Sequence, residues 1–184
     1  MKTTVTTHKL SGYRETLRTA KYLSEQGVRI VSRAVSGRMP NVQITLTNPR
    51  GIAELATAAE AELVGGIDKR VRSRAERTTA RMARDAYGLA IPLADGSVLV
   101  LVNVDKHGNP AEFAVTLVHE LVHAMQFSRK GVRERLIQNL RHEFGVERQS
   151  RRQTREHERG VEDDEREARG HEYLANELVP GAAA

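Results

Sequence analysis

The sequence predicts a mainly helical α+β domain, with a small antiparallel or mixed sheet packed near one apolar helix at residues 113–127. Aromatic residues make up only 4% of the chain and tryptophan is absent, so the core must consist mainly of leucine, valine, isoleucine and alanine, which favours helices. Several segments place apolar residues at helical spacing, whereas a few short ones have strand-like patterns. With 184 residues, the chain is long enough for one domain, residues 1–184, with a substantial core.

The N-terminal part, residues 1–65, is expected to contain helices and a strand. Residues 13–26 have helical apolar spacing, and Gly27 is expected to end that helix as its C-cap. Residues 28–35 are rich in β-branched side chains, and residues 42–46 alternate apolar and polar side chains, which is typical of a half-buried strand. Asn48 and Pro49 then supply an N-cap and a first-turn proline for a helix to about Val64.

A basic helix is expected next, over residues 67–87, at the start of a middle part that spans residues 66–146. Its arginines are spaced four and three residues apart and therefore share one face: Arg70, Arg74, Arg77, Arg81 and Arg84. This stripe could follow a phosphate backbone or an acidic partner. We favour a solvated helix face, because charge runs usually have that role and no aromatic residues interleave for base stacking.

A β-hairpin is expected to follow, with strands at residues 89–93 and 98–104 joined by a turn at Asp95-Gly96. Asn109 and Pro110 again supply a cap and a first-turn proline, so the next helix should begin near Ala111. A strand just before that helix could bind an extended peptide by β-augmentation, or it could be an ordinary sheet strand.

The strongest functional signal is the sequence His119-Glu120-Leu121-Val122-His123 in this apolar helix. His119 and His123 lie one turn apart on the same face, so both imidazoles can bind one metal ion. A catalytic zinc site has three protein ligands and one open position, so a third ligand must come from elsewhere. Glu120 lies beside the metal, where this motif assigns it the role of general base toward a water molecule. Without a metal, three polar groups buried here would each cost about 1–3 kcal/mol.

The C-terminal third offers the third ligand. Residues 132–144 have the apolar spacing of a packing helix, which carries His142. Residues 147–160 are polar and rich in arginine, and we interpret them as a mobile loop or an exposed helix that could form a lid. Acidic residues dominate thereafter, and a helix within residues 161–180 is expected to supply a carboxylate ligand.

The chain resembles zincin metallopeptidases of the gluzincin type, in which the motif His-Glu-x-x-His is completed by a glutamate on a later helix. The stretch HELVHAMQF is similar to the equivalent segment in ImmA/IrrE-type peptidases and in peptidase domains of phages and mobile elements. In those relatives the second motif is a glutamate followed shortly by alanine. Two registers fit it here: Glu172 in EYLANEL and Glu167 in EREAR. We favour Glu172, because Leu174, Ala175 and Leu178 bury its surroundings more firmly.

The resemblance implies a zincin-like fold that binds one Zn²⁺ ion and hydrolyses peptide bonds of a protein or peptide, most simply as an endopeptidase. Tyr173 and His142 are candidate hydrogen-bond donors to the transition state. Two imidazoles and a carboxylate would also suit iron or manganese. The alternative is a non-enzymatic module of phage or mobile-element type that binds DNA or protein through the Arg70–Arg84 stripe and keeps a structural metal site.

Composition limits the kinds of site, the location and the partners that the sequence allows. The absence of cysteine excludes disulfides, Cys-ligated zinc and thiol catalysis. No secretory signal or membrane-spanning segment is recognisable in the sequence, so we expect a soluble, cytoplasmic protein that does not bind membranes. A formal net charge of +5 allows contact with nucleic acid without requiring it. The sequence leaves the substrate and the oligomeric state open.

Overall fold

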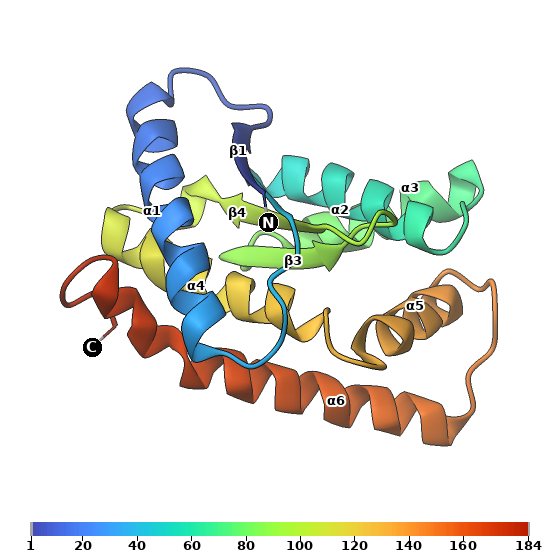
Figure 1. Ribbon diagram of the computed structural model, residues 1–184. Coiled ribbons are helices and arrows are strands. Elements are labelled where there is room, and N and C mark those ends of the chain that lie inside the picture. The colour runs from blue at the N-terminus through green and yellow to red at the C-terminus, as the bar shows by residue number, and fades with distance from the viewer. Residues whose placement is uncertain (1, 184) are drawn as a thin grey trace.

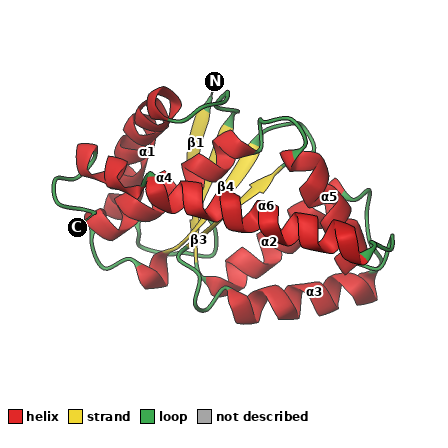
Figure 2. Ribbon diagram, turned by 90° about the horizontal axis from the view of Figure 1, so that it is seen from below, coloured by secondary structure: helices red, strands yellow, loops and turns green. Residues whose placement is uncertain are grey.

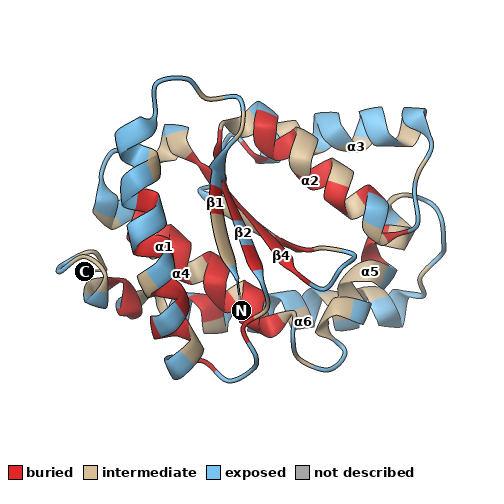
Figure 3. Ribbon diagram, turned by 45° about the horizontal axis from the view of Figure 1, so that its top comes forward, coloured by how far each residue is buried: buried red, intermediate tan, exposed pale blue. Residues whose placement is uncertain are grey.

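The computed structural model describes residues 2–183 and has a four-stranded mixed sheet between two layers of helices (Figures 1 and 3). The sheet order is β1-β2-β4-β3, in which β1, β2 and β4 are parallel and β3 is antiparallel to β4. The strands are β1 (Thr3–Thr7), β2 (Val42–Thr47), β3 (Gly88–Pro92) and β4 (Val98–Asn103). This arrangement confirms the predicted α+β class and the small mixed sheet, although the edge strand β1 was not predicted.

The central strand β4 is buried along its whole length because helices cover both faces of the sheet. Val98, Val100 and Val102 face the larger core, whereas Leu99 and Leu101 face a smaller core on the opposite side. A strand covered on both faces has a continuous apolar sequence instead of an alternating one.

Two long helices, α1 (Arg14–Ala34) and α4 (Pro110–Gln126), cover the face of the larger core. The prediction that the first helix ends at Gly27 was wrong, since α1 continues for two more turns. A Cβ atom at Gly27 would lie 3.2 Å from side-chain atoms of both Leu117 and Leu121. Glycine is therefore used here for close packing of α1 on α4.

The opposite face is covered by α2 (Pro49–Leu63), and α3 (Lys69–Met82) packs on α2. As predicted, Asn48 caps α2, accepting a hydrogen bond from the backbone N–H of Gly51 at 3.0 Å. The side chain of Asp68 caps α3, which begins later and ends earlier than the predicted 67–87. No residue of α3 is buried, so this helix is attached to the outside of the domain (Figure 3).

The predicted hairpin and the start of the histidine helix are confirmed. Strands β3 and β4 are joined through Asp95, whose side chain accepts hydrogen bonds from Ser97. A short 3₁₀ helix, η1 (Val104–Lys106), follows, and the Asn109 side chain caps α4 with Pro110 as its first residue.

The C-terminal region consists of α5 (Val132–Glu143), α6 (Arg151–Gly170) and a 3₁₀ helix, η2 (Glu172–Glu177). The arginine-rich segment predicted at 147–160 as a loop or exposed helix is helical from Arg151, where Ser150 and Gln153 form a reciprocal capping box. Helix α6 crosses α4 and continues into the region expected to supply the third ligand (Figure 2). The helix predicted within 161–180 is therefore the end of α6 followed by η2.

Among residues 2–183, none of the helices combines the length and the apolar character needed to span a membrane.

Candidate metal centre

Helix α4 presents its two histidines to one point, because residues four apart lie on the same helical face. The Nε2 atoms of His119 and His123 are 3.1 Å apart. The surrounding turns of α4 are anchored in the core by Leu117, Leu121 and Met125, none of which is exposed to solvent. The two imidazoles are therefore held on a rigid helix at the edge of the core.

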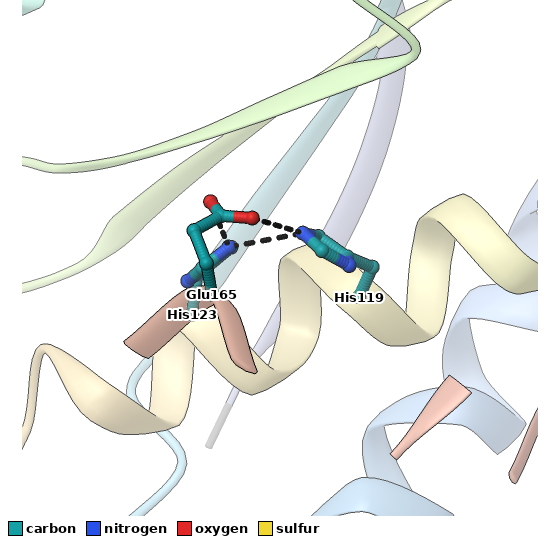
Figure 4. Close-up of side chains that lie close together, drawn as sticks. All are labelled: His119, His123 and Glu165. Carbon is teal, nitrogen blue, oxygen red and sulfur yellow. Dashed lines mark hydrogen bonds and ion pairs between the residues drawn. The ribbon is translucent and has the colours of Figure 1, made fainter. Parts of the chain in front are cut away.

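The third candidate ligand comes from α6 and is Glu165, which lies opposite the two imidazoles (Figure 4). Glu165 Oε1 is 3.2 Å from His123 Nε2, and Oε2 is 3.6 Å from His119 Nε2. The structure therefore differs from the sequence-based choice of Glu172 and from the alternative Glu167, neither of which joins this cluster.

The spacing of these atoms suits a metal ion. In a tetrahedral zinc site, bonds of about 2.0–2.1 Å place neighbouring ligand atoms about 3.4 Å apart. The two Nε2 atoms are 3.1 Å apart, and each lies close to a different oxygen of the Glu165 carboxylate, at 3.2 and 3.6 Å, so these spacings are near that value. Two imidazole nitrogens and one carboxylate are also a donor set that catalytic zinc uses in proteins. The cluster could therefore hold a metal ion without rearrangement of the backbone.

Each histidine is oriented from behind by a second group. Glu172 Oε1 lies 2.8 Å from Nδ1 of His119, and Gln126 Oε1 lies 2.8 Å from Nδ1 of His123. Both oxygens accept, so each Nδ1 is assigned as the protonated nitrogen, and each Nε2 keeps its lone pair for the site. Glu172 thus orients His119 and does not itself face the cluster.

The other predicted alternative, Glu167, has a structural role. Arg129 donates two hydrogen bonds to its carboxylate, at 2.6 and 2.7 Å, and this pairing lowers the pKa of Glu167 to about 2. Gln126 Nε2 also donates to Glu167 and to the backbone carbonyl of Asp164, at 3.0 and 2.8 Å. These bonds fasten α6 to the end of α4 next to Glu165.

Glu120 lies beside the cluster and is only 6% exposed. Burial raises the pKa of its carboxyl to about 7, against the opposing effect of the nearby His123, while the N–H of Ala90 donates to it. Gly88 makes room for this carboxyl: a Cβ atom there would lie 2.8 Å from Glu120 Oε1 and 2.9 Å from Thr116 Cγ2.

The electrostatic environment differs between the two histidines. Burial and the neighbouring His123 lower the pKa of His119. Burial also acts to lower the pKa of His123, but the Glu165 carboxylate, 3.2 Å from Nε2, and the nearby Glu120 favour the charged imidazolium, outweigh that effect and raise the pKa. The contact with His123 in turn lowers the pKa of Glu165.

The cluster opens into a cavity of about 770 Å³ between β3, α4, α5 and α6. Apolar side chains form much of its wall, among them Leu89, Val115, Phe127 and Leu136. A cavity of this size that brings together a few polar groups is typical of a ligand site.

Both predicted transition-state donors lie away from this cavity. Tyr173 is 59% exposed and stacks on His171, and the ring of His142 contacts backbone atoms of Glu147 and Gln149. Instead, His157 of α6 lines the cavity. Sequence reasoning also missed Glu165, for which a signal existed: it lies three residues before Ala168, which is buried, so both residues share one face of α6.

The predicted basic stripe lies apart from the metal centre, on α3. Four of its arginines lie in the helix and Arg84 lies just beyond the helix end, so the five do not share one continuous helical face. All five, Arg70, Arg74, Arg77, Arg81 and Arg84, are exposed.

Comparisons of the chain with protein families, with curated proteins and with solved structures give no match.

Proposed function

We propose that this protein is a zinc-dependent peptidase, most simply an endopeptidase, with His119, His123 and Glu165 as metal ligands. The observation that supports this most directly is the convergence of two Nε2 atoms and one carboxylate, from helices distant in sequence, at distances of 3.1–3.6 Å in the wall of a cavity. The His-Glu-x-x-His spacing and the buried glutamate next to this cluster favour hydrolysis over a purely structural metal site.

The proposed chemistry divides the work among the residues of the site. A zinc ion bound here would supply Lewis acidity. Glu120 takes a proton from the attacking water and delivers it to the leaving amine, so that the carbonyl gains the oxygen as the C–N bond breaks. Its position is fixed by the N–H of Ala90 and by the space that Gly88 leaves. Glu172 and Gln126 keep the two imidazoles in the correct orientation and tautomer.

The edge strand β3 supports a peptide as the substrate. Two backbone hydrogen bonds flank the paired residues of β3: Asn103 N–H donates to the Tyr87 carbonyl, and Leu93 N–H donates to the Ser97 carbonyl. In this register the odd-numbered residues of β3 bond to β4. The backbone groups of Gly88 and Ala90 therefore point away from the sheet, and both residues line the cavity. Because the Ala90 N–H donates to Glu120, an extended chain could pair with this edge through the Ala90 carbonyl and the backbone of Gly88. Pro92 has no N–H to donate and would end such pairing.

The proposal is tested by metal analysis of the untagged protein and by cleavage of an unfolded protein such as casein. We expect about one zinc ion per chain and chelator-sensitive cleavage. Glu120→Gln should retain the zinc but lose cleavage by at least about 100-fold, within the range for a general base. Glu134→Gln, at an exposed glutamate of α5, is the matched control. Absence of bound zinc, or full activity of Glu120→Gln, would overturn the proposal.

A further inference from the structure

Helix α3 concentrates the positive charge of the whole chain. It carries six basic side chains and one acid, a net of five positive charges, which equals the formal net charge of +5 for all 184 residues. The basic residues are Lys69, Arg70, Arg72, Arg74, Arg77 and Arg81. Charge on the rest of the chain therefore balances, and the excess lies on one 14-residue helix.

The six basic side chains of α3 face solvent. All are exposed, and among residues 2–183 none of them forms an ion pair. Helix α6 differs, since its six arginines alternate with seven acids and several of them pair. Like charges at spacings of three and four residues destabilise a helix by about 0.2–0.5 kcal/mol per pair. An arrangement that costs stability and gives no internal contact points to an external anion.

The outward side chains indicate the kind of anion. Arg70, Arg74, Arg77 and Arg81 form a row about 16 Å long. Regularly spaced guanidinium groups complement a regularly spaced polyanion, and they bind phosphate oxygens bidentately. A membrane-surface helix would need a large apolar face directed outward, whereas only Met82, at the end of α3, is a strongly exposed apolar residue of this helix.

We propose that α3 is a docking surface for the phosphate backbone of a nucleic acid, a function beyond the proposed peptidase activity. The helix contains no aromatic side chain that could stack on bases and no asparagine or glutamine that could pair with adenine. The proposed contacts are those of the guanidinium groups with phosphate oxygens, which carry no sequence information. The segment after α3, residues 85–90, forms part of the cavity wall.

The experiment measures binding of full-length protein to a fluorescent duplex DNA of about 20 base pairs as a function of salt. The test variant replaces Arg70, Arg74, Arg77 and Arg81 by glutamine, which retains helix propensity. The control variant replaces four exposed arginines near or in α6, namely Arg148, Arg151, Arg155 and Arg159, and so has the same net charge. Circular dichroism verifies that each variant is folded.

We expect micromolar binding at about 50 mM salt, and a plot of log K against log salt with a steep negative slope. The α3 variant should bind at least about tenfold more weakly, with a slope shallower by about one for each arginine that contacts phosphate. The control variant should bind within about threefold of the wild type, and Glu120→Gln should bind normally whatever its effect on cleavage. Three results would overturn the proposal: no binding, equal weakening in both arginine variants, or tighter binding to phosphatidylserine vesicles or polyglutamate than to DNA.

Discussion

Substitutions can distinguish Glu165, the proposed third metal ligand, from the two other candidate glutamates. Glutamine is the suitable replacement, since it keeps the size of glutamate but removes the charge and the strong metal affinity of the carboxylate. The structure gives each position a different role: Glu165 faces both Nε2 atoms, Glu172 accepts from Nδ1 of His119, and Glu167 pairs with Arg129. The three substitutions should therefore have different effects on zinc affinity and on stability.

The magnitudes follow from these contacts. Loss of an orienting partner reduces metal affinity by about 10–100-fold. Glutamine at position 172 can still accept the hydrogen bond, so Glu172→Gln should weaken zinc binding by about tenfold, or about 1.4 kcal/mol. Glu165→Gln removes a direct ligand and should exceed 100-fold, or about 2.7 kcal/mol. Glu167→Gln breaks a partly buried double hydrogen bond and should lower the free energy of unfolding by about 1–2 kcal/mol, with a small effect on zinc affinity.

The assay is competition for zinc with a chromophoric chelator, after the metal has been removed from each protein. Unfolding in the presence of excess chelator provides the control, because Glu165→Gln and the wild type should then have similar stability. A larger loss of zinc affinity in Glu172→Gln than in Glu165→Gln would refute the geometric assignment and restore Glu172 as the ligand.

Further predictions concern Glu120, the half-buried carboxyl of Glu60 and metal binding. Gly88→Ala should displace Glu120 and lower activity while costing about 1–3 kcal/mol of stability by overpacking; Gly170→Ala, whose added methyl group meets no atom within 4 Å, should do neither. Burial and a neighbouring carboxylate raise the pKa of Glu60 to about 7, so its ionisation should destabilise the fold as pH rises from about 4.5 to 7. In urea unfolding, Glu60→Gln should raise the free energy of unfolding by about 1–3 kcal/mol at about pH 8 and by little at about pH 4. A similar increase from the exposed control Glu62→Gln would show that the raised pKa of Glu60 is not the cause. Chelation should lower the melting temperature of the wild type, and an unchanged melting temperature would argue against tight metal binding.

Features encoded by neighbouring residues were determined by the sequence alone. The caps at Asn48-Pro49 and Asn109-Pro110, the turn at Asp95-Gly96 and the pairing of His119 with His123 on one helical face all depend on contacts within a few residues. Such contacts form whatever the rest of the chain does, so their patterns are legible in sequence.

Only the tertiary structure decided which carboxylate meets the histidines and what Gly27 does. Glu165, Glu167 and Glu172 belong to one acidic segment, but α6 ends at Gly170 and the chain tightens into η2, so Glu172 meets Nδ1 of His119 while Glu165 meets Nε2. Gly27 resembles a helix end in sequence, yet it lies within α1 because α4 packs against it. Both outcomes depend on how helices distant in the chain cross, and that is fixed by packing rather than by local preference.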